Sequence, residues 1–141
     1  MFHAKEYVKA ESLEQAYELN QKRSNVLAGG MMWLKMSSRN AVIDLSGLGL
    51  DQIEETEEEF RIGCMCSLRQ LELHEGLNRY FDGVFRECTR WIVGTQFRNT
   101  ATVGGSVFGR FGFSDILTCM MILDSYVELY KGGTVSLEEF A

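Results

Sequence analysis

The sequence predicts an α+β fold of two lobes, and three observations carry this prediction. Up to about residue 50, strand and helix patterns alternate in the βαβ order that gives parallel pairing. Beyond it, short alternating runs over 52–62 and 126–136 predict two hairpins with helical segments between them. Two glycine-rich runs, at 29–30 and 104–112, interrupt these patterns. Such runs are typical of places where a ligand approaches the backbone.

The first lobe is expected to contain a small parallel sheet. Short apolar runs predict its three strands at residues 6–10, 25–28 and 41–45. A helix is expected after the first strand, because Ser12-x-x-Gln15 has the spacing of a capping box. Residues 31–36 are expected to form one or two helical turns, so that helix and strand alternate throughout the lobe.

The second lobe, about residues 51–141, is expected to combine antiparallel strands with helices. Ser67-x-x-Gln70 repeats the capping-box spacing and predicts a helix start. Apolar residues recur at helical intervals over 77–88, which is the strongest amphipathic signal in the chain. Residues 116–123 form a continuous apolar run, predicted to be a buried helix that begins at Ser114 or Asp115. The second hairpin is predicted to turn at Gly132-Gly133.

Composition excludes several classes of function. The chain has 141 residues, the usual size of one domain, and its hydrophobic share of 45% and charged share of 24% are those of globular proteins. Its net charge is −6 with no basic block, so no nucleic-acid surface is expected. No apolar run reaches the ~18 residues of a membrane span, and the N-terminus does not resemble a signal peptide. A cytoplasmic protein is therefore expected.

The cysteines and histidines do not predict a metal site. Cys64 and Cys66 are too close for the usual zinc or iron–sulfur patterns, and no second pair completes four ligands. His3 and His74 are isolated from each other. The four cysteines, which also include Cys88 and Cys119, are expected to be reduced thiols.

The glycine-rich runs are the candidate binding elements. The stretch 98–115 holds Gly104, Gly105, Gly109 and Gly112, and the upstream strand 25–28 runs directly into Gly29-Gly30. Clustered glycine is favourable only where φ is positive or another molecule lies close to the main chain. Without a lysine cluster, a phosphate ligand would depend on backbone N–H groups, and two glycine turns far apart in sequence can face the same ligand.

The ordered set of motifs resembles a known family. The segments Val26-Leu-Ala-Gly-Gly30, Arg61-Ile-Gly63, Arg98-Asn-x-Ala-Thr-Val-Gly-Gly105 and Ser114-Asp115, followed by an apolar helix, are similar in order and spacing to the FAD-binding subunits or domains of molybdenum hydroxylases such as xanthine dehydrogenase and carbon monoxide dehydrogenase. The likeness runs from Glu6 to about Phe140. Neither glycine pair is specific alone, whereas the ordered set is.

The resemblance implies a PCMH-type FAD-binding fold, with FAD between the lobes at about 1–50 and 51–141. It also implies that the family's C-terminal domain is absent from this sequence. Carried over position by position, the cofactor-binding residues are Val26, Leu27, Ala28, Gly29, Gly30, Met31, Met32 and Trp33 in the first loop, Ile92 ahead of the second, Thr102, Val103, Gly104, Gly105 and Ser106 in the second, and Ser114 and Asp115 beyond it. Thr102 and Ser106 are expected to add hydroxyl donors, and Asp115 to lie near ribose hydroxyls. No catalytic side chain is expected, because the chemistry belongs to the flavin.

The function implied by the resemblance is electron transfer. Electrons would pass from [2Fe–2S] clusters of a small subunit to FAD and then to NAD or another acceptor, beside a molybdopterin-binding large subunit. Met31-Met32 stand where the family often has polar residues, and Ser106 stands where it usually has asparagine. An interaction module without flavin, which holds these subunits together through apolar residues, is therefore the alternative, and self-association is a further expectation. The flavin hypothesis requires that both glycine runs face one cleft and that Met31 and Phe111 do not fill it.

Overall fold

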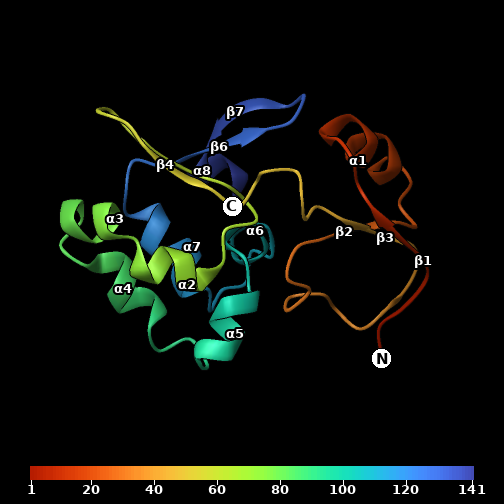
Figure 1. The fold of residues 1–141 in the computed structure, drawn as a ribbon, viewed down its shortest axis with the longest axis horizontal. Helices are drawn as coiled ribbons and strands as arrows, with labels where there is room; N and C mark the ends of the chain where they lie inside the picture. Colours follow the sequence, from red (N-terminus) through yellow and green to blue (C-terminus); the bar gives the residue numbers. More distant parts are fainter.

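The small lobe consists of a three-stranded parallel sheet and one helix. The computed structural model describes all residues, 1–141, and this lobe lies at one end of the molecule (Figure 1). Its elements are β1 (His3–Lys9), α1 (Leu13–Asn20), β2 (Val26–Ala28) and β3 (Ser38–Asp44). The strands pair in the order β1-β3-β2, with Val42 opposite both Tyr7 and Val26. Helix α1 begins where predicted, since Ser12 Oγ accepts the N–H of Gln15 at 3.1 Å.

The connection from β2 to β3 is a loop, so the predicted helical turns at 31–36 are wrong. Met31 has φ of 60°, in the left-handed region that ends regular structure. Met31 and Met36 are exposed, so no apolar face is available to stabilise a helix this short. The loop instead crosses to the second lobe and contacts it through Trp33.

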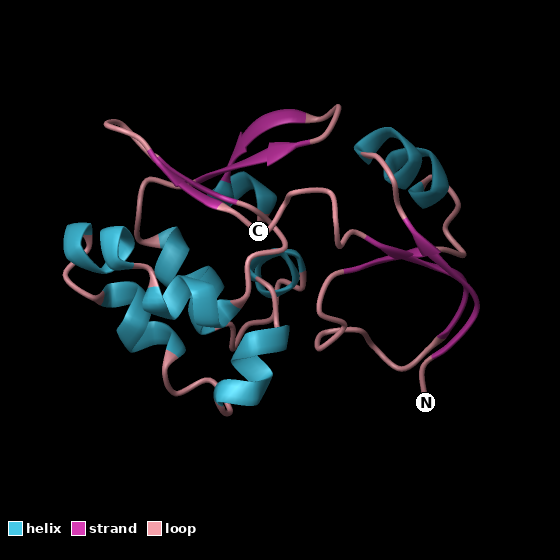
Figure 2. Ribbon diagram, in the orientation of Figure 1, coloured by secondary structure: helices cyan, strands magenta, loops and turns pink.

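The large lobe is mostly helical, and two antiparallel hairpins lie beside its helices (Figure 2). Its strands are β4 (Ile53–Glu55), β5 (Phe60–Ile62), β6 (Tyr126–Leu129) and β7 (Gly133–Ser136). Its helices are α2 (Leu68–Leu73), α3 (Glu75–Tyr80), α4 (Val84–Thr89), α5 (Thr95–Thr100), α6 (Val103–Phe108), α7 (Asp115–Met121) and α8 (Leu137–Phe140). Both predicted hairpins are present, and β4 pairs only with β5 and β6 only with β7. These features confirm the α+β class with a small parallel lobe.

The predicted helix starts of the large lobe are confirmed, whereas the amphipathic stretch 77–88 is divided. Ser67 and Gln70 form a complete capping box, and Ser114 caps α7. The stretch splits into α3 and α4 because Asp82 and Gly83 both have positive φ, which a continuous helix does not allow. Most of its apolar residues still face inward, since Leu77 and Phe85 are buried and Phe81, Val84 and Cys88 pack against the core, whereas Tyr80 is exposed.

The run 98–115 was expected to be a glycine-rich loop, yet most of it is helical. It includes the end of α5, all of α6 and the start of α7. Gly104 is in the first turn of α6, where a Cβ atom would lie 2.6 Å from the carbonyl oxygen of Cys64. The glycine is therefore required by the packing of α6 against the chain that follows β5.

Two separate hydrophobic clusters support the lobes. The cluster of the small lobe contains Ala10, Ala16 and Ile43. That of the large lobe contains 13 buried residues between Cys66 and Leu137, and apolar residues of the hairpins pack against it. A lobe boundary near residue 50 remains a prediction. None of the helices combines the length and apolar character needed to cross a membrane.

Candidate functional site

The two glycine runs lie against each other at the junction of the lobes. A Cβ atom on Gly30 would meet the carbonyl oxygen of Thr100 at 1.7 Å, and one on Gly29 would meet Thr102 Oγ1 at 2.8 Å. A Cβ atom on Gly105 would lie 3.0 Å from Trp33 Cδ1. The runs therefore share one region, as the flavin hypothesis requires.

The first run presents a series of free backbone amides. The N–H groups of residues 29–33 donate no hydrogen bond within the chain. Met31 is in the left-handed region, and a turn that combines such a residue with its neighbours directs successive N–H groups toward one side. This loop has the character of an anion-binding concavity without a basic side chain.

The second run does not present free amides, contrary to the expectation. Val103 N–H donates to the carbonyl of Cys66 at 2.8 Å, and Gly104 N–H donates to that of Cys64 at 2.9 Å. Gly105 N–H donates to Thr102 Oγ1, the cap of α6, at 3.2 Å. Because Cys64, Cys66 and Thr102 accept these N–H groups, the first turn of α6 has no amide left for a diphosphate.

The hydroxyl of Ser106 already donates inside the protein, whereas Thr102 Oγ1 only accepts, from the N–H of Gly105, so a donor role of Thr102 stays a prediction. Both residues are buried. Ser106 Oγ donates to the carbonyl of Thr102 at 3.0 Å and accepts the indole N–H of Trp33 at 3.2 Å. The hydroxyl of Ser106 is therefore used inside the protein, where it fixes Trp33 against α6.

Trp33 is the centre of an aromatic cluster that forms one side of the site. Its ring contacts those of Phe97 and Phe111 at centroid distances of 5.4 and 5.5 Å, and that of Phe113 at 6.3 Å. Phe111 and Phe113 stack at 5.1 Å. Met31 is 55% exposed. Phe111 thus packs on Trp33, and the side chain of Met31 remains exposed to solvent.

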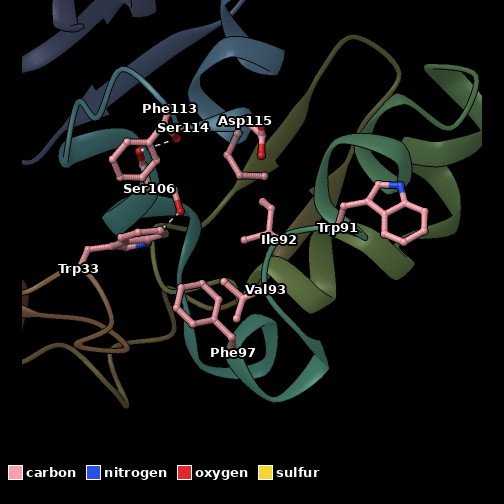
Figure 3. Close-up of a pocket in the computed structure, with 10 residues that line it drawn as sticks. Trp33, Trp91, Ile92, Val93, Phe97, Ser106, Phe113, Ser114 and Asp115 are labelled. Atoms are coloured by element: carbon pink, nitrogen blue, oxygen red, sulfur yellow. Dashed lines mark hydrogen bonds between the residues drawn. The ribbon is translucent and has the colours of Figure 1, made fainter.

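A cavity of about 370 Å³ lies beside this cluster, within the usual range for ligand pockets. Figure 3 shows its walls, which come from the first loop, the segment before α5, and α5, α6 and α7. The lining residues are Trp33, Trp91, Ile92, Val93, Phe97, Ser106, Phe113, Ser114, Asp115 and Ile116.

Only some of the residues predicted from the sequence line the cavity. They are Trp33, Ile92, Ser106, Ser114 and Asp115. The predicted residues Val26, Leu27 and Ala28 form β2, which leads into the first loop, and Val103 is buried in the large core.

Ser114 and Asp115 have different roles at the cavity. Ser114 Oγ accepts the N–H of Leu117 at 3.2 Å and so caps α7. Asp115 is exposed and makes no hydrogen bond or ion pair within the chain. Its carboxylate is thus the free hydrogen-bond acceptor at the cavity.

Sequence reasoning missed half of the wall. Five of the ten lining residues were not among the predicted site residues: Trp91, Val93, Phe97, Phe113 and Ile116. One usable signal was the apolar run Trp91-Ile92-Val93, which ends at Gly94 and is too short for a core helix. Trp91 and Val93 are 77% and 80% exposed, so this run is not explained by core packing.

A buried ion pair lies behind this wall. Arg98 Nε is 2.8 Å from Glu72 Oε2, and Arg69 Nη1 is 2.8 Å from Glu72 Oε1. Burial alone would raise the pKa of Glu72, but the hydrogen bonds and charges of the two arginines outweigh it and lower that pKa below its ordinary value. Glu72 is therefore a carboxylate at neutral pH, and it compensates the charge of buried Arg98.

The thiol of Cys66, near the junction, is not a reactive group. Cys66 is fully buried and donates from Sγ to the carbonyl of Gln52 at 3.2 Å. Burial raises the pKa of its thiol to about 11, so little thiolate forms at neutral pH.

The residues present fit FAD at one of the two expected loops. The free amides of residues 29–33 match a diphosphate, the apolar and aromatic cavity walls match a planar ring, and Asp115 matches a hydroxylated chain. The first turn of α6 contributes by supporting Trp33. Its own amides and hydroxyls are already bonded.

The fold and the loop geometry define a domain that can hold a nucleotide between a parallel-sheet lobe and a helical lobe. The sequence matches, over residues 2–141, the family described as the FAD binding domain in molybdopterin dehydrogenase. The chain belongs to this family. This match confirms the family resemblance seen in the sequence. The protein class is a flavoprotein domain of molybdenum-containing oxidoreductases, with FAD as its cofactor.

Individual relatives agree with this assignment. The chain is 27% identical over 141 residues to the uncharacterized protein YgfM of Escherichia coli K12, covering 96% of this chain and 53% of the relative. It is 25% identical over 131 residues to the 6-hydroxypseudooxynicotine dehydrogenase complex subunit alpha of Paenarthrobacter nicotinovorans, covering 86% and 44%. The chain thus spans about half the length of these relatives.

A solved structure supports the fold independently. Reconstituted CO dehydrogenase from Oligotropha carboxidovorans superposes with a TM-score of 0.84, covering 94% of this chain and 50% of that chain. The sequences are 22% identical. This likeness establishes the two-lobed fold.

Proposed function

We propose that this chain binds FAD through the backbone amides of residues 29–33, which hold the diphosphate. The single observation that carries the proposal is the row of five N–H groups without an acceptor, at the junction of the lobes and next to the cavity. Successive amides of this kind bind phosphate oxygens without a basic side chain. Trp33 is the last residue with a free amide, and its side chain forms a wall of the cavity. The same loop can therefore contact the phosphates and a ring of FAD bound beside them.

The remaining site residues have roles that follow from their surroundings. The exposed carboxylate of Asp115 can accept hydrogen bonds from ribose or ribityl hydroxyls. Ile92 and Phe97 supply apolar contact area for a planar ring. Ser106 acts indirectly, since its hydroxyl holds the indole of Trp33. When bound, the flavin supplies redox chemistry that no side chain of the site can supply.

We further propose that the protein is the flavin component of a molybdenum hydroxylase complex. In this assignment the chain accepts electrons from a [2Fe–2S] small subunit and passes them to NAD or another acceptor. The third component of the complex is a molybdopterin-binding large subunit. Membership of the family supports it, as does the name of the relative from Paenarthrobacter nicotinovorans, which is a subunit of a dehydrogenase complex. Co-purification of both subunits with the tagged protein is expected, and recovery of the protein without either would contradict this assignment.

The test of FAD binding uses two matched charge variants. Met32→Glu places a carboxylate beside the free amides, where it repels a diphosphate, whereas Met36→Glu makes the same change farther along the same loop. Met32 and Met36 are 42% and 83% exposed, so both variants are expected to fold. We expect Met32→Glu to weaken FAD binding at least about tenfold in equilibrium dialysis, and Met36→Glu to leave it unchanged.

Competition identifies the part of FAD that the loop holds. ADP, which shares the diphosphate, is expected to displace FAD, and riboflavin, which lacks it, is expected to compete far less well. Failure of the protein to bind FAD, or equal effects of the two charge variants, would overturn the proposal.

A second candidate function is a flavin-free interaction subunit. The observation that favours it is the internal bonding of α6, together with the packing of Trp33 on Phe97 and Phe111 across the junction. Under this alternative the purified protein is colourless, shows no thermal shift with FAD and still recovers the two partner subunits.

A further inference from the structure

The segment between α4 and α5 contains a strained residue at the cavity wall. Val93 has φ of 51°, in the left-handed region that a β-branched side chain rarely adopts. Its side chain is 80% exposed, so core packing does not impose the conformation. Such strain persists only where neighbouring contacts impose it, and it is concentrated at functional sites.

Arg98 supplies those contacts on both sides of Val93. Its Nη1 donates to the carbonyl oxygen of Ile92 at 3.2 Å, and its Nη2 donates to Thr95 Oγ1 at 3.4 Å. Val93 therefore lies between two points attached to the same guanidinium group. The third donor, Nε, bonds to Glu72 at 2.8 Å.

Glu72 fixes Arg98 from behind. Both side chains are less than a tenth exposed, and the second carboxylate oxygen of Glu72 is held by Arg69. A buried guanidinium that uses its planar set of donors on three acceptors has little freedom to move. The position of the Ile92 carbonyl is thereby linked to α2, which contains Glu72.

The segment held in this way forms the cavity wall opposite Trp33. Trp91, Ile92 and Val93 all line the cavity, and in Figure 3 Ile92 and Val93 lie between Trp91 and the group that contains Phe97 and Trp33. A shift of the Ile92 carbonyl would alter the shape of this wall without changing any residue of the first loop.

We propose that Arg98 is a positioning residue for FAD, which holds residues 91–94 in the strained conformation that completes the cavity. The inference rests on the proposed FAD binding and adds to the site a buried residue that does not line the cavity. Arg69 provides the matched comparison, because it pairs with the same carboxylate and has no contact with the cavity wall.

The experiment compares Arg98→Lys with Arg69→Gln. FAD binding is measured in the otherwise unchanged protein, because Trp33 belongs to the proposed site. Trp91 emission is measured in the Trp33→Phe background, where Trp91 is the remaining tryptophan. Lysine keeps the charge beside Glu72 but cannot also donate to the Ile92 carbonyl. We expect Arg98→Lys to weaken FAD binding about tenfold and to change the emission and acrylamide quenching of Trp91. Arg69→Gln is expected to lower Tm without either change.

The strain itself is tested at Val93 without altering a buried charge. Asparagine tolerates positive φ, so Val93→Asn is expected to raise Tm, whereas Val93→Thr keeps the β-branch and is expected to leave it unchanged. Equal Tm values for these two variants would overturn the strain argument even if Arg98→Lys does not fold.

The outcomes separate this inference from the proposed function. If the parent protein does not bind FAD, the proposed function fails. If it binds FAD and folded Arg98→Lys binds it equally well with unchanged Trp91 emission, only the positioning role of Arg98 fails.

Discussion

Gly30 and Thr100 touch through their backbones, and a Cβ atom on Gly30 would lie 1.7 Å from the carbonyl oxygen of Thr100. This contact joins the loop after β2 to the end of α5, and so joins the two lobes beside the candidate site. The glycine is required there by the packing of two backbones, whether or not a ligand is bound.

The first prediction follows from this contact. Gly30→Ala forces the loop away from Thr100 and is expected to lower the free energy of unfolding by about 3 kcal/mol, as overpacking does. Gly112→Ala is the control, because no atom lies within 4 Å of the added carbon and its φ is not left-handed. It is expected to be neutral or to stabilise by about 0.5 kcal/mol. Equal effects in urea unfolding would contradict the packing argument.

A second contact between the lobes is electrostatic. Glu14 of α1 pairs with Lys131 of the β6–β7 turn at 2.6 Å and also accepts the hydroxyl of Tyr130. We expect Glu14→Gln and Lys131→Gln each to lower Tm slightly, and the double variant to lower it no further than the larger single effect. The differences in Tm between these variants and wild type should disappear in about 1 M salt, because ions at that concentration screen an exposed charge pair. Additive effects would show that the pair does not couple the lobes.

The bond between Trp33 and Ser106 gives a prediction with its own spectroscopic readout. Ser106→Ala leaves the indole N–H without its acceptor and is expected to lower stability by about 1–2 kcal/mol. In the Trp91→Phe background the same change should alter the emission of Trp33. Thr100→Ala removes a nearby hydroxyl that bonds only to the carbonyl of Gln96, so it is expected to leave the emission unchanged. A change of emission in both variants would contradict the assignment.

Features set by neighbouring residues could be predicted from the sequence. The helices that begin after Ser12, Ser67 and Ser114 were found because a cap acts within one turn, and both hairpins because alternation is local. The turn of the second hairpin moved to Lys131, whose φ is 58°. Local rules thus located the elements and left their ends imprecise.

Features set by tertiary contacts could not be predicted. Gly104-Gly105 indicated an open turn, but they lie in α6, where the close approach of Cys64 and Trp33 favours glycine. Residues 31–36 indicated a helix, yet they form a loop whose Trp33 bonds to Ser106 of the large lobe. The wall formed by Trp91 and Val93 depends on Arg98, which contacts Glu72 of a helix distant in sequence. The family motifs therefore led to the first loop, whose role in binding FAD stays a prediction, and they indicated only Ile92 in the wall opposite Trp33.

The pH dependence of stability is predicted to depend on Glu72. The pKa of this carboxyl is lowered in the folded protein below its ordinary value of 4.5, so the ion pair stabilises fully above that pH and is lost as pH falls through the lowered pKa. Glu72→Gln leaves Arg98 buried without its partner and is expected to cost about 3 kcal/mol at pH 7.

Glu87→Gln is the matched control for Glu72→Gln, since Glu87 pairs with Arg90 on the surface, where such pairs contribute at most about 1 kcal/mol. In thermal unfolding between pH 7 and pH 3, the Tm difference between wild type and Glu72→Gln should shrink below pH 4.5, because Glu72 of the unfolded chain then becomes protonated, and the folded carboxylate follows at lower pH. The difference for Glu87→Gln should stay small throughout. If the Tm difference between wild type and Glu72→Gln were constant across this pH range, the variant would act through lost packing. The charge of Glu72 would then not hold Arg98 in place.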